Sequence, residues 1–116
     1  MFAQQWAAAW NAHDIEQVLR HFADDVVFAS PLAATLLPES RGVVCGKDQL
    51  RRYWMAGIER YPDLHFQVLD VYVGVGAVVI RYLSQQGRTV CECLEFDDTS
   101  SVFIRGFGCY EVSSVN

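Results

Sequence analysis

Two residues of opposite charge, Arg81 and Glu92, stand on neighbouring strand-like segments and are the first candidates for chemistry in this sequence. The dipeptide Gln86-Gly87 between the two segments is typical of a β-hairpin turn. Counting outward from a two-residue turn places Arg81 directly opposite Glu92, so that both side chains share one face of the sheet. A carboxyl group can transfer a proton there while a guanidinium group stabilises negative charge. We therefore take Glu92 and Arg81 as the candidate catalytic residues.

The same register predicts what surrounds this pair and what faces away from it. The inward set is Val79, Arg81, Leu83, Val90, Glu92, Leu94 and Phe96. The outward set is Val78, Ile80, Tyr82, Cys91 and Cys93. An outer face this apolar indicates a covered surface, and we expect a second copy of the chain to cover it in a symmetric homodimer. A structural salt bridge between Arg81 and Glu92 remains the alternative to a catalytic pair.

Aromatic residues in the helical patterns are candidates for the walls of a pocket above this floor. Trp6 and Trp10 recur at helical spacing near the N-terminus, and Tyr53 and Trp54 lie in a later helical segment. Rings with a polar edge suit a flat apolar ligand, although such stripes also form ordinary cores. The expected ligand-binding residues are Trp6, Trp10, Ser30, Tyr53, Trp54, His65 and Leu83. The facing of His65 is open, because the sequence does not fix its strand parity.

Periodicity and capping signals predict the elements that position these residues. We expect a helix from Phe2 to about Asn11, a second that opens at Asp14 and stops around 23–25, and a third through 50–58. The expected strands are 26–29, 42–46, 64–73, 77–85, 88–96 and 102–111, with 31–41 as an irregular segment and candidate lid. Helices followed by an antiparallel meander predict a single α+β domain over residues 1–116. Its curved antiparallel sheet would wrap around the three helices and enclose the pocket.

Composition and charge limit the classes of partner. The chain has 116 residues, of which 52% are hydrophobic and 20% are charged, as expected for one packed domain. A net charge of −5 argues against a nucleic-acid partner. No apolar run is long enough to cross a membrane, and the N-terminus lacks a secretory pattern, so we expect a cytoplasmic location. The four cysteines lack structural-zinc spacing and no dinucleotide or phosphate-loop pattern is present, so neither metal nor cofactor is expected.

Several stretches of the chain resemble the nuclear transport factor 2-like superfamily, which includes SnoaL-like polyketide cyclases, ketosteroid isomerases and limonene epoxide hydrolases. The similar stretches are Trp-Asn-Ala-His-Asp (10–14), Phe-Ala-Asp-Asp-Val-Val-Phe (22–28), Gly-Lys-Asp-Gln-Leu-Arg-Arg-Tyr-Trp (46–54) and Glu-Phe-Asp-Asp (95–98). The resemblance implies a cone-shaped, cystatin-like α+β fold with a deep pocket between helices and sheet, and frequent dimers. Sites on one fold diverge freely, so activity does not follow from the fold.

Residues that would carry a ketosteroid isomerase activity are mostly replaced. Ser30 stands where such an isomerase has its aspartate base, and a serine alone cannot act as that base. Trp6 and Trp54 stand in place of its two tyrosines, and an indole N–H is a far weaker acid than a phenol. Glu92 is the one match, to the acid that is held protonated to stabilise an oxyanion.

The epoxide hydrolase pattern is also incomplete, because Leu83 and Gly108 stand near the positions of its two aspartates and Arg81 alone matches. Polyketide cyclases of the superfamily use an acid/base carboxylate in the pocket, for which Glu92, with His65 or Tyr110 beside it, is the candidate. We therefore expect a pocket for a small apolar ligand and cofactor-free isomerase, cyclase or lyase chemistry. Ketosteroid isomerase and epoxide hydrolase activities are disfavoured. A non-catalytic small-molecule-binding module and a dimeric interaction module are the alternatives.

Overall fold

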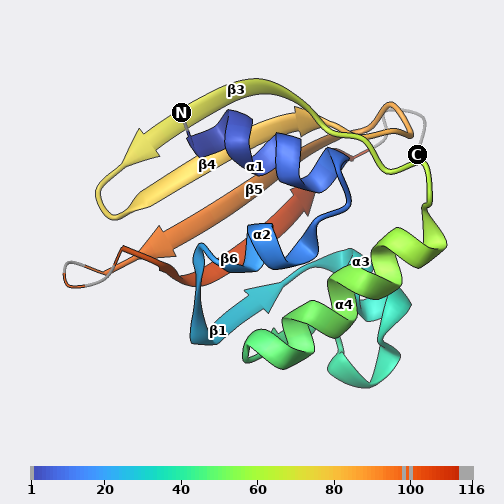
Figure 1. Cartoon of the computed structure of the whole chain (residues 1–116), viewed down its shortest axis with the longest axis horizontal. Coiled ribbons are helices and arrows are strands. Elements are labelled where there is room, and N and C mark those ends of the chain that lie inside the picture. The colour runs from blue at the N-terminus through green and yellow to red at the C-terminus, as the bar shows by residue number, and fades with distance from the viewer. Residues whose placement is uncertain (1, 98, 100, 113–116) are drawn as a thin grey trace.

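A curved, unclosed six-stranded sheet carries the helices on one face in the computed structural model, which describes residues 2–97, 99 and 101–112 (Figure 1). The helices are α1 (Phe2–Asn11), α2 (Ile15–Leu19), α3 (Pro31–Leu36), the 3-10 helix η1 (Pro38–Ser40) and α4 (Lys47–Arg60). The strands are β1 (Phe22–Ala29), β2 (Val43–Cys45), β3 (Gln67–Gly74), β4 (Ala77–Leu83), β5 (Thr89–Phe96) and β6 (Phe103–Tyr110). The predicted α+β class is confirmed. In the residues that the structure describes, none of the helices combines the length and hydropathy that spanning a bilayer requires.

The strand order is β2-β1-β6-β5-β4-β3, and the expected meander from β3 to β6 is antiparallel throughout. The fully antiparallel sheet that we expected is wrong at one place, because β1 and β6 run parallel. Most of the chain, including α4 and four strands, separates these two strands, so β6 can return to β1 in the same direction. This pairing brings the end of β1 next to β5 and β6, where the candidate site lies.

Capping explains where α2 begins. The Asp14 carboxylate accepts a hydrogen bond from the Gln17 backbone N–H at 3.2 Å, which confirms the predicted start. The helix ends at Leu19, earlier than expected, because the backbone already joins the sheet there: Phe103 N–H donates to the His21 carbonyl at 2.7 Å. Strand β1 therefore begins at Phe22, ahead of the predicted 26–29.

Most of the segment 31–41 is helical, so its prediction as an irregular segment is wrong, whereas its role as a lid stays a prediction. Pro31 occupies the first turn of α3, where a missing N–H costs nothing, and Ser30 Oγ accepts from the Leu32 N–H at 3.2 Å. Ser40 Oγ donates to the Leu37 carbonyl at 2.6 Å and holds the following 3-10 turn. Pro31 and Pro38 each stand at the start of a short helix, where proline is tolerated.

Turn length sets the register of the β4–β5 hairpin, and the two-residue turn that we predicted is wrong. Ser84 closes a longer loop, because its N–H donates to the Arg88 carbonyl at 2.9 Å and its carbonyl accepts from Gly87 at 2.9 Å. Gly87 has φ +75°, a left-handed conformation that glycine adopts freely. The register moves by one residue relative to the prediction, so Arg81 lies opposite Cys91 rather than opposite Glu92.

This slip exchanges the faces of β4 while leaving those of β5 as predicted. Ile80 and Tyr82, which we expected outside, are 0% and 5% exposed and belong to the core. Cys91 and Cys93 face outward as expected, on the side opposite to Glu92. The core between helices and sheet is rich in aromatic rings, as shown by Trp10 and other tryptophan and phenylalanine residues in mutual contact.

Candidate functional site

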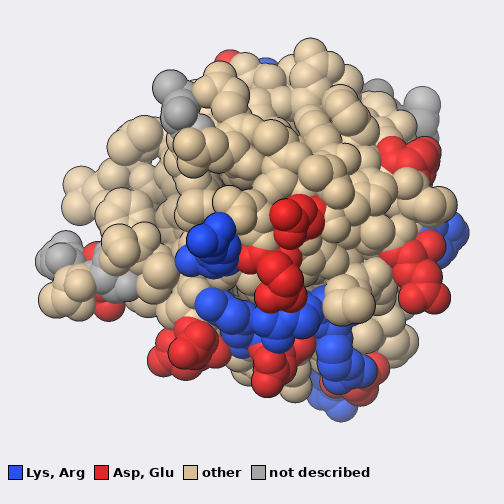
Figure 2. Space-filling view, in the orientation of Figure 1, with Lys and Arg blue, Asp and Glu red and all other residues tan. Residues whose placement is uncertain are grey.

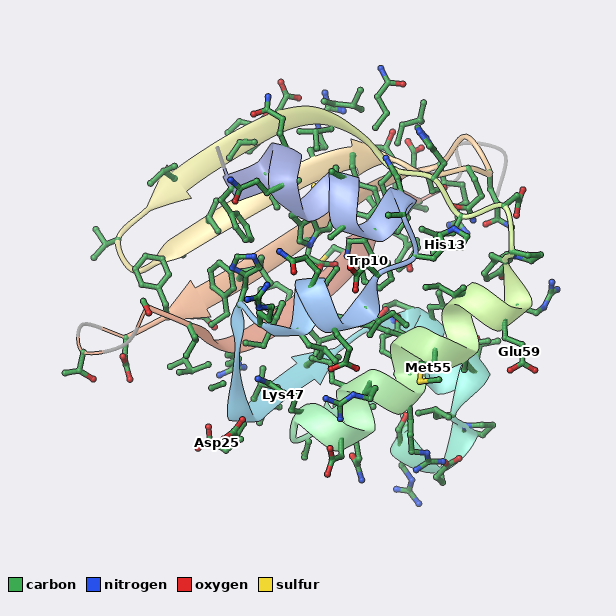
Figure 3. The ribbon with its side chains drawn as sticks, in the orientation of Figure 1. Trp10, His13, Asp25, Lys47, Met55 and Glu59 are labelled. Atoms are coloured by element: carbon green, nitrogen blue, oxygen red, sulfur yellow. The ribbon has the colours of Figure 1, made fainter. Side chains whose placement is uncertain are left out.

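A cavity of about 50 Å³ lies between the helices and the concave face of the sheet, and its walls are mostly aromatic. The rings that line it belong to Trp10, Phe28, Tyr53, Trp54, Phe66, Tyr82 and Tyr110. Trp10 projects from α1 toward the middle of the molecule (Figure 3). Ser30 and Glu92 add polar groups to this lining. The geometry combines apolar contact area with a few convergent polar atoms, which is typical of small-molecule sites.

A second cavity of about 110 Å³ adjoins the first and leads toward the β4–β5 turn. The two share seven lining residues: Leu32, Gly57, Leu64, Phe66, Tyr82, Val90 and Tyr110. The outer cavity is more polar, because the loop residues Ser84, Gln85, Gln86 and Arg88 line it. We call it the mouth. A ligand that enters here meets polar groups first and aromatic walls further in.

Glu92 provides the acidic group of the inner cavity. It lies on the concave face of β5, opposite Ile80 on one side and Gly108 on the other, and is 6% exposed. Its Oε2 atom has no hydrogen-bond partner among the described residues. Burial raises the pKa of this carboxyl group to about 8. The group is therefore mostly protonated at neutral pH and is a hydrogen-bond donor there.

Trp6 brings a donor close to this carboxyl group. Its indole N–H partly opposes the rise in the pKa of Glu92. The same Nε1 atom forms no complete hydrogen bond with any described group, so we treat the contact as weakly electrostatic. A buried acid without a firm partner is costly to desolvate, and a ligand that accepted its proton would relieve that cost.

Three hydroxyl groups gather on the other side of the inner cavity. The Tyr53 hydroxyl donates to Ser30 Oγ at 3.0 Å, and this hydrogen bond is buried. Burial raises the pKa of Tyr53 and that of Tyr110, and proximity to Glu92 adds to both shifts. All three are neutral donors at physiological pH. Because Tyr53 donates its one proton to Ser30, the donors left for a carbonyl oxygen on a ligand are Ser30, Tyr110 and Glu92.

Five residues of the predicted site line the inner cavity: Trp10, Ser30, Tyr53, Trp54 and Glu92. Trp6 does not line it, because its ring is 1% exposed and packs against Phe66 and Tyr82 at centroid distances of 5.6 and 5.2 Å. It acts as a wall behind the cavity.

Three predicted residues lie away from the cavity. Arg81 is on the convex face, where its Nε donates to Asp70 Oδ2 at 2.7 Å, so the predicted placement beside Glu92 is wrong. Leu83 shares that convex parity. His65 is exposed because the neighbouring Phe66 takes the inward position.

The residues that we did not predict as lining are chiefly Phe66, Tyr82 and Val90, together with Tyr110 and Gly108. The predicted hairpin register placed Tyr82 on the outer face of the sheet, so Tyr82 was not expected to line the cavity. Its inward position could have been predicted only from the longer β4–β5 loop. Val90 was expected to face inward but was not assigned to the lining.

Charged side chains gather away from this cavity, on the lower part of the face seen in Figure 2, where both signs are mixed. Arg51 of α4 bridges Glu16 of α2 at 2.6 Å and Asp48 at 2.8 Å. The Arg51–Glu16 pair links α2 to α4, whereas the Arg51–Asp48 pair lies within α4. Charges of both signs are thus mixed on this face.

Comparisons with known proteins agree with this architecture. The model of the SnoaL-like domain matches residues 3–114. A SnoaL-like protein of unknown function from Burkholderia thailandensis is 32% identical, with a TM-score of 0.87 over 96% of this chain and 92% of that one. Two proteins proposed to be polyketide cyclases share the fold. SMa1630 from Sinorhizobium meliloti is 15% identical (TM-score 0.74, 92% of each chain), and IdmH from Streptomyces antibioticus is 17% identical (TM-score 0.73, 94% and 88%). The search of curated proteins found no match.

Proposed function

Because the chain belongs to the SnoaL-like domain family and its cavity contains a buried, unpartnered acid, we propose that it is a cofactor-independent acid/base enzyme. Its substrate would be a small, largely apolar carbonyl compound, and its reaction an isomerisation or cyclisation. Similar folds in proteins proposed to be polyketide cyclases and a ketosteroid isomerase favour this class. The observation that carries the proposal is Glu92, a carboxyl group that is buried among aromatic rings without a counter-ion.

Glu92 would act first as an acid and then as a base. At neutral pH the protonated group gives its proton to the substrate carbonyl oxygen, and the carboxylate so formed takes a proton from the carbon beside the carbonyl, which yields the enol and restores the acid. A pKa of about 8 keeps the proton-transfer equilibrium close to balance near neutral pH, which is the condition for efficient acid/base catalysis. Negative charge that develops on the oxygen would be stabilised by the hydroxyl groups of Ser30 and Tyr110, because Tyr53 already donates its proton to Ser30 and holds that hydroxyl in place. They take the role that we first expected of Arg81.

Cavity size supports a small substrate. A cavity of about 150 Å³ accommodates one benzene ring in an engineered protein core. The inner cavity of about 50 Å³ and the mouth of about 110 Å³ together match a single ring or a short chain. Four fused rings, as in a steroid, would require the aromatic walls to move apart.

Replacement of the acid by its amide tests the proposal. Exchange of the α-protons of 4-methylacetophenone in D₂O, followed by NMR, reports cofactor-free enolisation. Glu92→Gln keeps the shape of the side chain and should lower the exchange rate about 100-fold or more while ligand binding persists. Glu95→Gln is the matched control, because Glu95 lies on the same strand but on the convex face beside Arg105. An unchanged exchange rate in Glu92→Gln would overturn the assignment.

A non-catalytic binding module is the second candidate, and the same experiment distinguishes it. The observation in its favour is the incomplete catalytic set: a serine and two tryptophans stand at Ser30, Trp6 and Trp54. A binder would take up 4-methylacetophenone in the wild type and in Glu92→Gln without accelerating exchange in either protein.

The convex face of the sheet supports a proposal about assembly, a homodimer through this face. One row of mutually paired residues crosses all six strands: Tyr72, Val79, Cys93, Phe107, Ala29 and Val43. Tyr72 is 55% exposed and Val43 is 45% exposed, a large apolar exposure for a sheet face. Sedimentation should give twice the 13.1 kDa chain mass, and Phe107→Glu should give the single chain mass. Val75→Glu, in the exposed β3–β4 turn, is the control and should leave the dimer intact.

A further inference from the structure

Arg88 lies at the entrance of the candidate site, on the same side of β5 as its acid. It precedes β5, and residues 88, 90 and 92 share one face of an extended segment. Arg88 and Val90 line the mouth, and Val90 and Glu92 line the inner cavity. Among the residues that the structure describes, Arg88 and Glu92 are the charged groups that line these two cavities. The path therefore starts at a cation and ends at a carboxyl group.

The Arg88 guanidinium is held over the mouth but is not neutralised. Its Cζ atom lies 5.4 Å from the centroid of the Tyr110 ring, which lines both cavities. Glu111 is the nearby acid, yet its Oε1 accepts from the Thr89 N–H at 2.9 Å. Arg88 itself reaches only the Glu111 backbone carbonyl, at 3.5 Å. Within the described residues Arg88 takes part in no ion pair, so most of its donors are available to a ligand.

We propose that the substrate carries a carboxylate, which Arg88 binds at the mouth while the carbonyl group at the other end reaches Glu92. This inference rests on the proposed acid/base function and names its substrate class. A guanidinium group binds a carboxylate through two parallel hydrogen bonds, which fixes orientation as well as position. The ligand would then enter with its carbonyl group first.

Strand geometry sets the length of such a substrate. Four residues of β-strand span roughly 13 Å between the Cα atoms of Arg88 and Glu92. Both side chains extend from these ends into the cavities, so a molecule about one aromatic ring long spans the remaining distance. This length agrees with the ring-sized volume of the cavities.

Two ketones that differ only in the proposed anionic group test the inference. 4-Acetylbenzoate carries a carboxylate where 4-methylacetophenone carries a methyl group. Binding of each is measured by tryptophan fluorescence and calorimetry with the full chain, for the wild type, Arg88→Gln and Arg20→Gln. Arg20 is an exposed arginine that follows α2, donates to Gln17 and lies outside both cavities, so its replacement controls for the change in net charge.

The wild type should bind 4-acetylbenzoate about tenfold more tightly than 4-methylacetophenone, a typical gain for a hydrogen-bonded charge pair. Arg88→Gln should abolish this preference by weakening the binding of 4-acetylbenzoate about tenfold. Arg20→Gln should retain it. Added salt should weaken the preference, because Arg88 is exposed.

Two results would overturn the inference and point to different causes. Equal binding of both ketones by the wild type, or a preference that survives in Arg88→Gln, would refute the role of Arg88 and leave the acid/base proposal standing. Failure of the wild type to bind either ketone at millimolar concentration would refute the ligand site itself.

Discussion

Glu92 lies directly opposite Gly108 on the neighbouring strand, and the absence of a side chain at Gly108 leaves that position to the hydroxyl group of Ser30. A Cβ atom at Gly108 would lie 3.5 Å from Ser30 Oγ. Glu92 therefore comes from β5, and Ser30 comes from the end of β1. Gly108 of β6 lies between them and leaves space because it has no side chain. The parallel pairing of β1 with β6 creates this arrangement.

Replacing each of two glycines of β6 by alanine should separate an effect on folding stability from an effect on ligand affinity. At Gly108 the added methyl makes ordinary contacts, so we expect the free energy of unfolding to change by less than about 1 kcal/mol. Ligand affinity should nevertheless fall, because the methyl group occupies the floor beside Ser30. At Gly106 the new atom would lie 2.8 Å from the Phe28 ring and 3.0 Å from Leu94, which predicts a loss of about 1–3 kcal/mol.

Urea unfolding of Gly106→Ala and Gly108→Ala, together with titration by an aryl ketone, measures both effects. A large loss of stability in Gly108→Ala would show that the gap is packed more tightly than the structure indicates.

The buried acid predicts a stability that falls as the pH rises. In the unfolded chain Glu92 ionises near 4.5, whereas in the folded chain its pKa is about 8. Below pH 4.5 both states are protonated and the full stability is present. Between pH 4.5 and 8 the unfolded state releases its proton first, so stability should fall by roughly 3–5 kcal/mol across this range. Above pH 8 both states are ionised and no further loss from this group is expected.

Glu92→Gln removes the titrating group and should flatten this slope. The comparison is a difference between two proteins, so contributions from other groups cancel, including His21, whose pKa burial lowers. Chemical denaturation at pH 5 and pH 8 provides the measurement. Equal pH dependence in both proteins would mean that Glu92 reaches water in the folded state.

The sequence predicted α1, α2, α4 and the inward face of β5, because their patterns are unambiguous, whereas it missed α3 and η1. Asp14 and Gln17 mark a helix start that the structure confirms. Val90 and Leu94 alternate with polar or small residues, so the inward position of Glu92 followed from the sequence alone. The longest aromatic stripes lie in helices that bury them, as their spacing indicates.

The facing of β4 could not be predicted, because Val78, Val79 and Ile80 are apolar on both faces and give no alternation. The prediction then depended on the turn alone. Ser84 decided that turn: its hydroxyl accepts from the N–H groups of Gln86 and Arg88 at 3.3 and 3.4 Å and stabilises the longer loop. A serine two residues before Gln86 indicates the longer loop only weakly, whereas Gln86-Gly87 is typical of a two-residue turn. The resulting register error of one residue placed Arg81 on the wrong face of β4.

Arg81 should therefore matter little for ligand binding. Its ion pair with Asp70 joins side chains that are 39% and 40% exposed on the convex face. Exposed pairs of this kind contribute about 0.2–1 kcal/mol. We expect Arg81→Gln to lower the free energy of unfolding by no more than this and to bind aryl ketones like the wild type. A loss of ketone affinity in Arg81→Gln, with the fold intact by circular dichroism, would contradict the observed register.

The buried hydrogen bond from Tyr53 to Ser30 should contribute to the free energy of unfolding, and Ser30 contributes further because it also caps α3. Tyr53→Phe removes one hydroxyl and should cost about 1 kcal/mol of stability. Ser30→Ala should cost about 2–3 kcal/mol, because it leaves the Tyr53 hydroxyl without its acceptor and also removes the cap on the Leu32 N–H. The double variant should be less destabilised than the sum of the two single changes, since the orphaned hydroxyl is then absent. Urea denaturation of all four proteins closes this cycle, and strict additivity would mean that the two hydroxyl groups do not interact in solution.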